Sequence, residues 1–239
     1  MNACGDARRL SGRVAIAAVE RNRRLVRAAH ELIGGRGYGS VGVAEICRRA
    51  EVQKGSFYHF YDSKQALTLA VIGAHWDEQR QIWRTLLSGP PPALSRLRRL
   101  LLAQAEAQQE SRALTGTVTG CLLANLALEL AHQEQAVATR LAEVFAEQIE
   151  MVLDTLEQAV EEGTVAKEIA THDTAQAILA QLEGLVLFAK LRNDPSVMNG
   201  LWKQVCQLIQ AHGPSAGSAR SFSIASATRC SSSHQPPAP

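Results

Sequence analysis

One cysteine stands where a helix is predicted to begin, in residues 115–131, which read TGTVTGCLLANLALELA. Cys121 follows a loop rich in glycine and threonine, and Asn125 and Glu129 come after it at intervals of four residues. Residues four apart share one face of a helix, and a helix N-terminus favours the thiolate form of cysteine. The spacing therefore predicts a nucleophilic thiol beside a pocket. A small buried core cysteine fits the same pattern.

A second segment has the residue types that hold phosphate groups. Residues 53–64 read QKGSFYHFYDSK, although only 5% of the whole chain is Phe, Trp or Tyr. A helix of two turns buries little surface, so Phe57 and either Phe60 or Tyr61 must anchor it from behind. The outward lysine, tyrosine and histidine can then contact a nucleic-acid backbone, and the small residues allow close approach. The candidate DNA-binding residues are Gln53, Lys54, Gly55, Ser56, Tyr58, His59 and Lys64.

Charge is divided unevenly along a chain whose formal net charge is +2. Residues 1–60 hold 11 Lys and Arg against 5 acids, which gives +6. Residues 121–170 hold 10 acids against 2 bases, which gives −8. A basic front end on an acidic body suits an anionic partner for the front end alone.

Other chemistries lack the required spacing. The segment GYGSVG at residues 37–42 matches a dinucleotide-binding pattern, but a helix and not a strand precedes it, so we interpret it as a turn between helices. The histidines have no metal-binding spacing, and five scattered cysteines without a C-x-x-C pair predict neither a zinc site nor a disulfide framework. We expect no catalytic residues, no metal and no cofactor. Without an apolar run of a membrane span's length or a secretory signal, we expect a cytoplasmic protein and no membrane partner.

The elements that position these residues are predicted to be helical throughout, because alanine, leucine, glutamate and glutamine dominate. An all-α fold of about nine helices is expected, with an N-terminal helix-turn-helix and a helical ligand-binding and dimerisation domain. The predicted helices span about 19–36, 43–50, 54–61, 64–87, 93–110, 121–133, 135–162, 173–191 and 196–211. The predicted domains are a flexible arm at 1–18, the helix-turn-helix domain at 19–66, the effector domain at 67–212 and a disordered tail at 213–239.

Residues 41–72, which read VGVAEICRRAEVQKGSFYHFYDSKQALTLAVI, resemble the DNA-binding domain of TetR/AcrR transcriptional regulators. Two departures are Gly42, where the family often has Thr or Ser, and Phe60-Tyr61, where it commonly has Tyr-Phe. The resemblance implies a double-stranded DNA operator, a homodimer formed by the last two helices and a small-molecule effector. Apolar stripes on those helices agree with this, but they can equally pack inside one subunit; they are Ile178, Leu182, Leu185 and Ala189, and Val197, Leu201, Val205 and Leu208.

The cysteine segment resembles a "GC(L/M)…L..E" helix in an electrophile-responsive branch of the family, which includes the repressor of N-ethylmaleimide reductase. That branch also has a lysine late in the penultimate helix, which corresponds to Lys190 here. The resemblance implies that electrophiles or oxidants modify Cys121, with support from Lys190, and that this releases DNA. Asn125 and Glu129 are expected to line the pocket, and helix 64–87 is expected to move and carry the change to the DNA-binding domain. Two alternatives stay open: a reversible ligand with a structural Cys121, and a thiol enzyme. For the enzyme, His132 lies too far along the same helix to act as a base.

Overall fold

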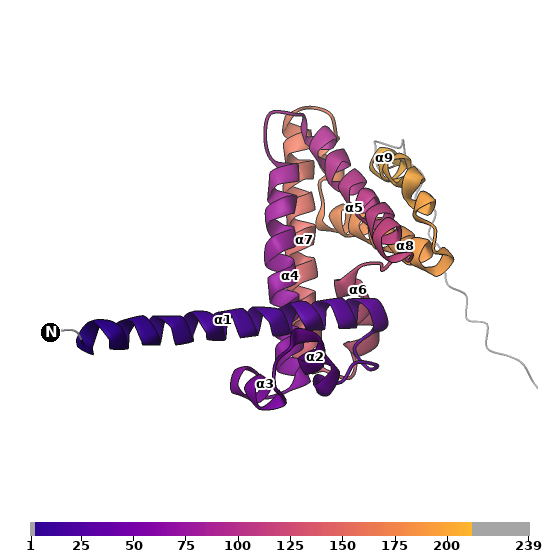
Figure 1. Cartoon of the computed structure of the whole chain (residues 1–239). Helices are drawn as coiled ribbons and strands as arrows, with labels where there is room; N and C mark the ends of the chain where they lie inside the picture. Colours follow the sequence, from indigo (N-terminus) through magenta and orange to yellow (C-terminus); the bar gives the residue numbers. More distant parts are fainter. Residues whose placement is uncertain (1–2, 212–239) are drawn as a thin grey trace, which may run out of the picture.

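The computed structural model describes residues 3–211, with side chains described from residue 16 to residue 209. Within that range it contains helices and no strand, which confirms the predicted all-α fold (Figure 1). The α-helices are α1 (Ala3–Arg36), α2 (Val43–Ala50), α3 (Lys54–Phe60), α4 (Lys64–Leu87), α5 (Ala93–Thr115), α6 (Leu122–Leu130), α7 (Gln135–Glu161), α8 (His172–Arg192) and α9 (Leu201–Ala211). Two short 3-10 helices are η1 (Lys167–Ile169) and η2 (Pro195–Gly200).

Helices α1, α2 and α3 form a small head at one end of the molecule. Leu25 of α1, Ile46 of α2 and Phe57 of α3 are each 0% exposed and belong to the core. Helix α2 ends at Ala50, and its C-cap residue Glu51 adopts a left-handed conformation (φ 55) and donates its backbone N–H to the carbonyl of Arg48. This tight reversal between α2 and α3 is the connection that a helix-turn-helix requires.

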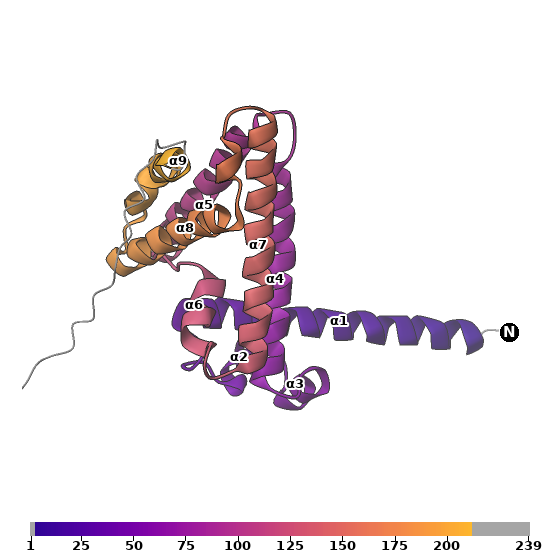
Figure 2. The same cartoon turned by 180° about the vertical axis from the view of Figure 1, so that it is seen from behind.

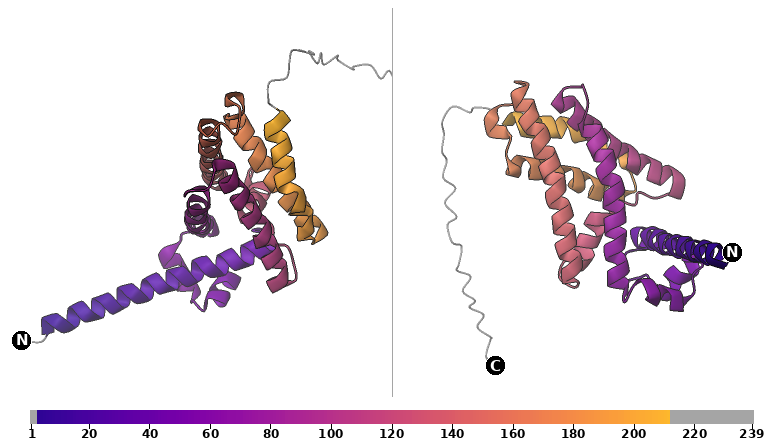
Figure 3. Two further views of the ribbon diagram at one scale, coloured as in Figure 1. Left: turned by 90° about the horizontal axis from the view of Figure 1, so that it is seen from above. Right: turned by 90° about the vertical axis from the view of Figure 1, so that its left-hand side faces the viewer.

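Helix α1 begins at Ala3, well before the predicted start at residue 19. Residues 3–18, predicted to be a flexible arm, are therefore the first half of one continuous helix. That half projects away from the rest of the molecule (Figures 1 and 3), whereas the second half packs on α2 and α4. The predicted tail at 213–239 lies outside the described residues.

Helix α4 runs from the head into the body, where it lies beside α7 (Figure 2). The Trp76 indole on α4 donates a hydrogen bond of 2.6 Å to Glu147 of α7, and Arg80 pairs with the same carboxylate at 2.8 Å. The predicted domain boundary at residues 66 and 67 falls in the first turn of α4. Head and body are therefore joined by a continuous helix and not by a loose linker.

Both apolar stripes predicted for dimerisation pack largely inside the subunit. On α8, Ile178, Leu182, Leu185 and Ala189 are all buried, and on α9 Leu201 and Val205 are buried. The reason is that α8 packs on α5, α7, η2 and α9 within one chain. By length and composition alone, α8 would also suit a membrane span, but its buried face is typical of the core helix of a helical body.

Candidate nucleic-acid interface and candidate effector cavity

Helix α3 presents a polar face to solvent and one aromatic ring to the core. Phe57 is fully buried, whereas the Tyr58 side chain is 53% exposed. The other exposed candidates are Gln53, Lys54, Gly55 and His59, and Ser56 is half-buried. The helix thus places the predicted contact residues outward on a two-turn element held by one ring.

The second anchor predicted for α3 is shared between Phe60 and Tyr61. Both side chains are half-buried against the core. The Tyr61 hydroxyl also donates a hydrogen bond of 2.6 Å to the side-chain oxygen of Asn22 on α1. Burial raises the pKa of Tyr61, so this phenol stays protonated and donates. Tyr61 therefore fixes the end of α3 to α1.

Lys64 differs from its predicted role as a free clamp on the DNA backbone. Its Nζ donates to the backbone carbonyls of Tyr38 at 2.9 Å and Val41 at 3.1 Å. The ammonium also lies 3.7 Å from the centre of the Tyr38 ring. Burial lowers the pKa of Lys64. A side chain that makes these contacts holds the loop between α1 and α2, so we assign it a positioning role.

Glu129 was predicted to face the same pocket as Cys121, and the structure contradicts this. Its carboxylate accepts hydrogen bonds from the backbone N–H groups of Tyr38 at 2.8 Å and Gly39 at 2.5 Å. A side chain at Gly37 or Gly39 would crowd this carboxylate, because an added Cβ would lie 3.1 or 3.0 Å from its oxygens. Gly37 also has a φ of +84, which favours glycine. Glu129 therefore ties the end of α6 to the head.

A second acid, Glu134, extends this contact. It accepts hydrogen bonds from the Tyr38 hydroxyl at 3.2 Å and from the Gln65 side chain. Burial, followed by the nearby carboxylates, raises the pKa of Tyr38 to about 12. We call the set of Tyr38, Gly39, Lys64, Glu129 and Glu134 the head latch. It joins the loop after α1 and the start of α4 to α6 and the residues that follow it.

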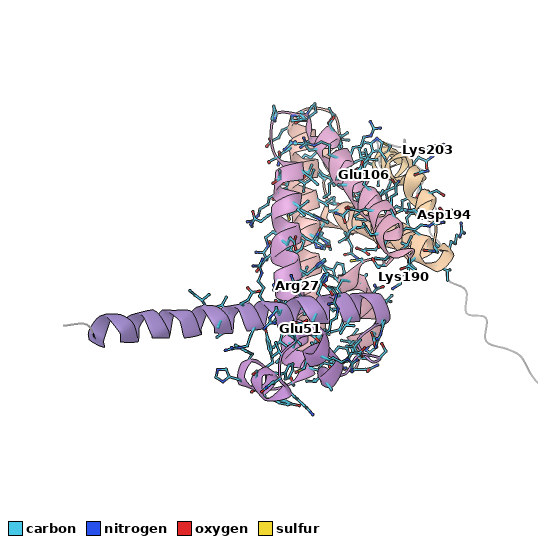
Figure 4. The ribbon with its side chains drawn as sticks, viewed as in Figure 1. Arg27, Glu51, Glu106, Lys190, Asp194 and Lys203 are labelled. Atoms are coloured by element: carbon cyan, nitrogen blue, oxygen red, sulfur yellow. The ribbon has the colours of Figure 1, made fainter. Side chains whose placement is uncertain are left out.

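At its other end, α6 borders a cavity of about 310 Å³. Three of the four predicted effector residues, Cys121, Asn125 and Lys190, line it. Lys190 donates a hydrogen bond of 2.9 Å to the Asn125 side-chain oxygen, and it lies at the end of α8 (Figure 4). The remaining wall is mostly apolar, formed by Ala124, Ala127, Leu128, Phe145, Val186 and Leu187.

The cavity does not activate Cys121 in the predicted way. Helix α6 begins directly after Cys121, yet the pKa of the Cys121 thiol is raised and not lowered. Burial is the main cause, followed by the negative charge of Glu183 on α8. The backbone N–H groups at the start of α6 oppose this shift but do not outweigh it. Lys190, which was expected to stabilise a thiolate, directs its ammonium to Asn125. The thiol is thus held in its neutral form.

Glu183 is the functional candidate that sequence reasoning missed. It lines the cavity beside Cys121 and also borders a second cavity between α4, α5 and α8. Its own pKa is raised by burial. The signal was present in the sequence, because residues 178–191 read ILAQLEGLVLFAKL, with one acid in an apolar run.

Two histidines join α1 of the head to α4. Nε2 of His30 on α1 lies 3.1 Å from Nδ1 of His75 on α4. Burial lowers the pKa of both rings, and the neighbouring His30 helps to bring that of His75 to about 4. One ring can donate to the other only while one of them is neutral, so the contact depends on this lowered pKa.

Family models match both parts of the chain. Residues 25–71 match the model described as bacterial regulatory proteins, tetR family, and residues 93–205 match the tetracyclin repressor-like C-terminal domain. The first range contains the helix-turn-helix, and the second runs from α5 to α9 and includes the cavity residues.

Individual relatives agree with the models. The chain is 36% identical over 182 residues to the transcriptional regulator AcuR of Cereibacter sphaeroides, covering 72% of this chain and 78% of AcuR. It is 31% identical over 106 residues to the transcriptional repressor NemR of Escherichia coli, covering 44% and 52%. The reduced form of E. coli NemR superposes with a TM-score of 0.68 at 26% identity, covering 77% and 94%.

Proposed function

Since the chain belongs to the tetR family of bacterial regulatory proteins, and is a regulator of transcription rather than an enzyme, we propose that it is a dimeric repressor. It releases its operator DNA when a ligand fills the cavity at Cys121 or when the Cys121 thiol is modified. In this proposal residues 19–66 bind DNA, residues 67–212 sense the effector and dimerise, and the protein acts in the cytoplasm. The observation that carries it is the position of α6, with the cavity at its start and the head latch at its end.

The DNA-binding half of the proposal rests on α3. Its exposed face combines Lys54, Tyr58 and His59 with the small Gly55 and the half-buried Ser56. In helix-turn-helix proteins such a second helix lies in the major groove, while backbone contacts fix its register. Gln53, at the N-cap of α3 and exposed, has the amide group that reads adenine.

The effector half rests on the cavity. Its volume of about 310 Å³ is at the lower end for small-molecule sites, and apolar walls with a few polar groups are typical of them. Cys121, Asn125 and Lys190 supply the thiol, the amide and the ammonium. A small electrophile that adds to the Cys121 sulfur would add volume directly at the start of α6.

Helix α6 then links this event to the head. It is a short helix of 9 residues, so it can move as one rigid unit, and a displacement at Cys121 also displaces Glu129. Glu129 holds the backbone of the loop before α2, and a shift of its carboxylate changes the position of α2 and α3. This differs from the sequence-based expectation, in which α4 transmits the change.

The dimer is proposed to use the outward face of α8. Leu187, Phe188 and Leu191 are 51%, 47% and 76% exposed, in contrast to the inward residues of the same helix. Three large apolar side chains near the end of α8 suit a contact with a second copy. Two heads would then meet half-sites about 34–36 Å apart.

A reversible ligand remains the second candidate, and one observation favours it. The raised pKa of Cys121 leaves a neutral thiol, which reacts slowly unless a base assists it. A non-covalent ligand needs only the cavity and its polar groups.

The test begins by selecting operator DNA from random duplexes with the full chain. Binding to the selected duplex is then measured for the wild type and for a Leu191→Lys variant, because Leu191 is 76% exposed and does not line the cavity. If the proposal is right, the wild type binds a two-half-site duplex as a dimer and the variant binds it at least about tenfold more weakly, because lysines would repel across the interface. A monomer that binds with full affinity would contradict the dimer proposal, and a failure to select any sequence would contradict operator binding.

A further inference from the structure

Glu183 is a half-buried carboxylate that lines the cavity beside the thiol proposed as the sensor. Its Oε2 atom is buried and has no hydrogen-bond partner among the described residues. The Cys121 thiol lies close enough to the Glu183 carboxyl for each group to shift the pKa of the other. Both line the same cavity. A buried oxygen without a hydrogen-bond partner destabilises the fold. A function for this carboxylate in the cavity would explain why it is there.

The surroundings of this pair decide what it can do. Val186 and Leu187 of α8 and Phe145 of α7 keep the cavity apolar. Burial raises the pKa of the Glu183 carboxyl, which makes its ionised form a stronger base. A base of this kind beside a neutral thiol is the arrangement by which a nucleophile is activated at the moment of attack. The thiol then needs no prior ionisation.

We propose that Glu183 is the general base for addition of the Cys121 thiol to α,β-unsaturated carbonyl compounds that enter the cavity. This inference rests on the proposed role of Cys121 as a sensor and names the class of molecule sensed. Such compounds suit the site because they are small and largely apolar, and because their carbonyl oxygen accepts hydrogen bonds. The exposed Lys190 ammonium at the cavity wall has further N–H groups beyond its bond to Asn125.

The reaction balances without any further reagent. The Glu183 carboxylate takes the S–H proton as the sulfur forms a bond to the β-carbon. The electron pair of the C=C bond moves toward the carbonyl oxygen and gives an enolate. The proton then passes from Glu183 to the α-carbon, which restores the carboxylate and leaves a neutral thioether on Cys121. Nothing is oxidised or reduced.

The test measures how fast Cys121 in the full chain is alkylated by N-ethylmaleimide, using intact mass and peptide mapping between pH 6 and pH 9. Glu183→Gln should slow the reaction at pH 7 at least about tenfold, because positioned proton transfer contributes 10²-fold or more. The matched control is Glu106→Gln, which removes an exposed carboxylate on α5 (Figure 4) and should leave the rate unchanged.

The contrary result is an unchanged or faster alkylation of Cys121 in Glu183→Gln. If Glu183 only places a negative charge beside the thiol, its removal lowers the thiol pKa and Glu183→Gln reacts as fast as the wild type or faster, which overturns the proposal. A second variant, Glu183→Asp, keeps the charge and shortens the reach. A slower rate in this variant supports the base, and an unchanged rate overturns it.

Operator binding separates this inference from the proposed function. Wild type and Glu183→Gln are both alkylated to completion and then tested on the selected duplex. If fully modified protein still binds DNA in both cases, the sensor function fails although the rate comparison stands. If both release DNA but their rates of modification are equal, Glu183 is not the base.

Discussion

The exposed face of α3 and the two ends of α6 use polar residues in opposite ways. On α3, Lys54, Tyr58 and His59 are exposed, as groups that bind an outside partner must be. On α6 and its neighbours, Glu129 accepts hydrogen bonds from backbone N–H groups of the head, and Glu183 lines the cavity beside the Cys121 thiol. This difference indicates that DNA recognition by α3 can be separated from control of DNA binding by the residues around α6. Changes on α3 should alter DNA affinity alone, and changes around α6 should alter stability or response.

The largest effect is expected on the α3 surface. A protein with Lys54→Ala, Tyr58→Ala and His59→Ala should bind its operator at least about 100-fold more weakly, because it loses three contacts worth about 1 kcal/mol or more each. Its melting temperature and its rate of Cys121 alkylation should match those of the wild type, since these side chains are exposed. Fluorescence anisotropy measures the operator affinity, calorimetry measures the melting temperature, and intact mass measures the rate of Cys121 alkylation. A large fall in melting temperature would contradict the proposal that these α3 residues affect DNA affinity without affecting stability.

The next effect concerns pH and the contact between α1 and α4. The pKa of His75 is lowered to about 4 in the folded protein, from an ordinary value of 6.5. As the pH falls below about 6.5 the unfolded chain binds the proton first, so the folded state loses stability until the pH is near 4. Between pH 8 and pH 5 the loss from this group should be about 2 kcal/mol. Urea unfolding at the two pH values measures it, and His75→Gln should flatten the difference.

The head latch should give an effect on stability of similar size and a distinct effect on response. Glu129→Gln replaces a carboxylate that accepts two backbone N–H bonds, and we expect a loss of about 1–3 kcal/mol in the free energy of unfolding. Modified Glu129→Gln protein should also release operator less completely than modified wild type. Glu143→Gln is the control, because Glu143 is an exposed residue paired with Arg140. Equal release by Glu129→Gln and wild type would remove α6 from the pathway.

The smallest change tests the anchor behind α3. Tyr61→Phe removes the hydroxyl that donates to Asn22, at an expected cost of about 1 kcal/mol in stability. Operator affinity should change less than with the triple variant, because Tyr61 lies on the supporting side of α3. Denaturant unfolding and anisotropy on one preparation give both numbers. An affinity loss as large as that of the triple variant would contradict the assignment of Tyr61 to anchoring α3 rather than to contacting DNA.

The sequence predicted the helices well because their signals are local. Gly37 ends α1, the apolar spacing around Ile46 and Cys47 marks α2, and Phe57 identifies the buried side of α3. The start of α1 was not predicted, because residues 3–18 contain no apolar face that distinguishes a helix from a basic arm.

The site was only partly predictable, for a physical reason. The spacing of Cys121 and Asn125 on one helix was sufficient to place both at the cavity. Glu129 has the same spacing, but its partners are about 90 positions away in the sequence, and no local pattern reveals them. The pKa of Cys121 was predicted in the wrong direction because burial and Glu183, both products of tertiary packing, outweigh the helix terminus.

The central claim is that the state of Cys121 sets the affinity for DNA. The most direct measurement is operator affinity before and after alkylation, in a protein with Cys4→Ser, Cys206→Ser and Cys230→Ser and in the same protein with Cys121→Ser added. Modification at Cys121 should weaken binding at least about 30-fold, equivalent to about 2 kcal/mol, and the added substitution should abolish that change. Equal release by both proteins, or unchanged binding by a protein fully modified at Cys121, would contradict the account.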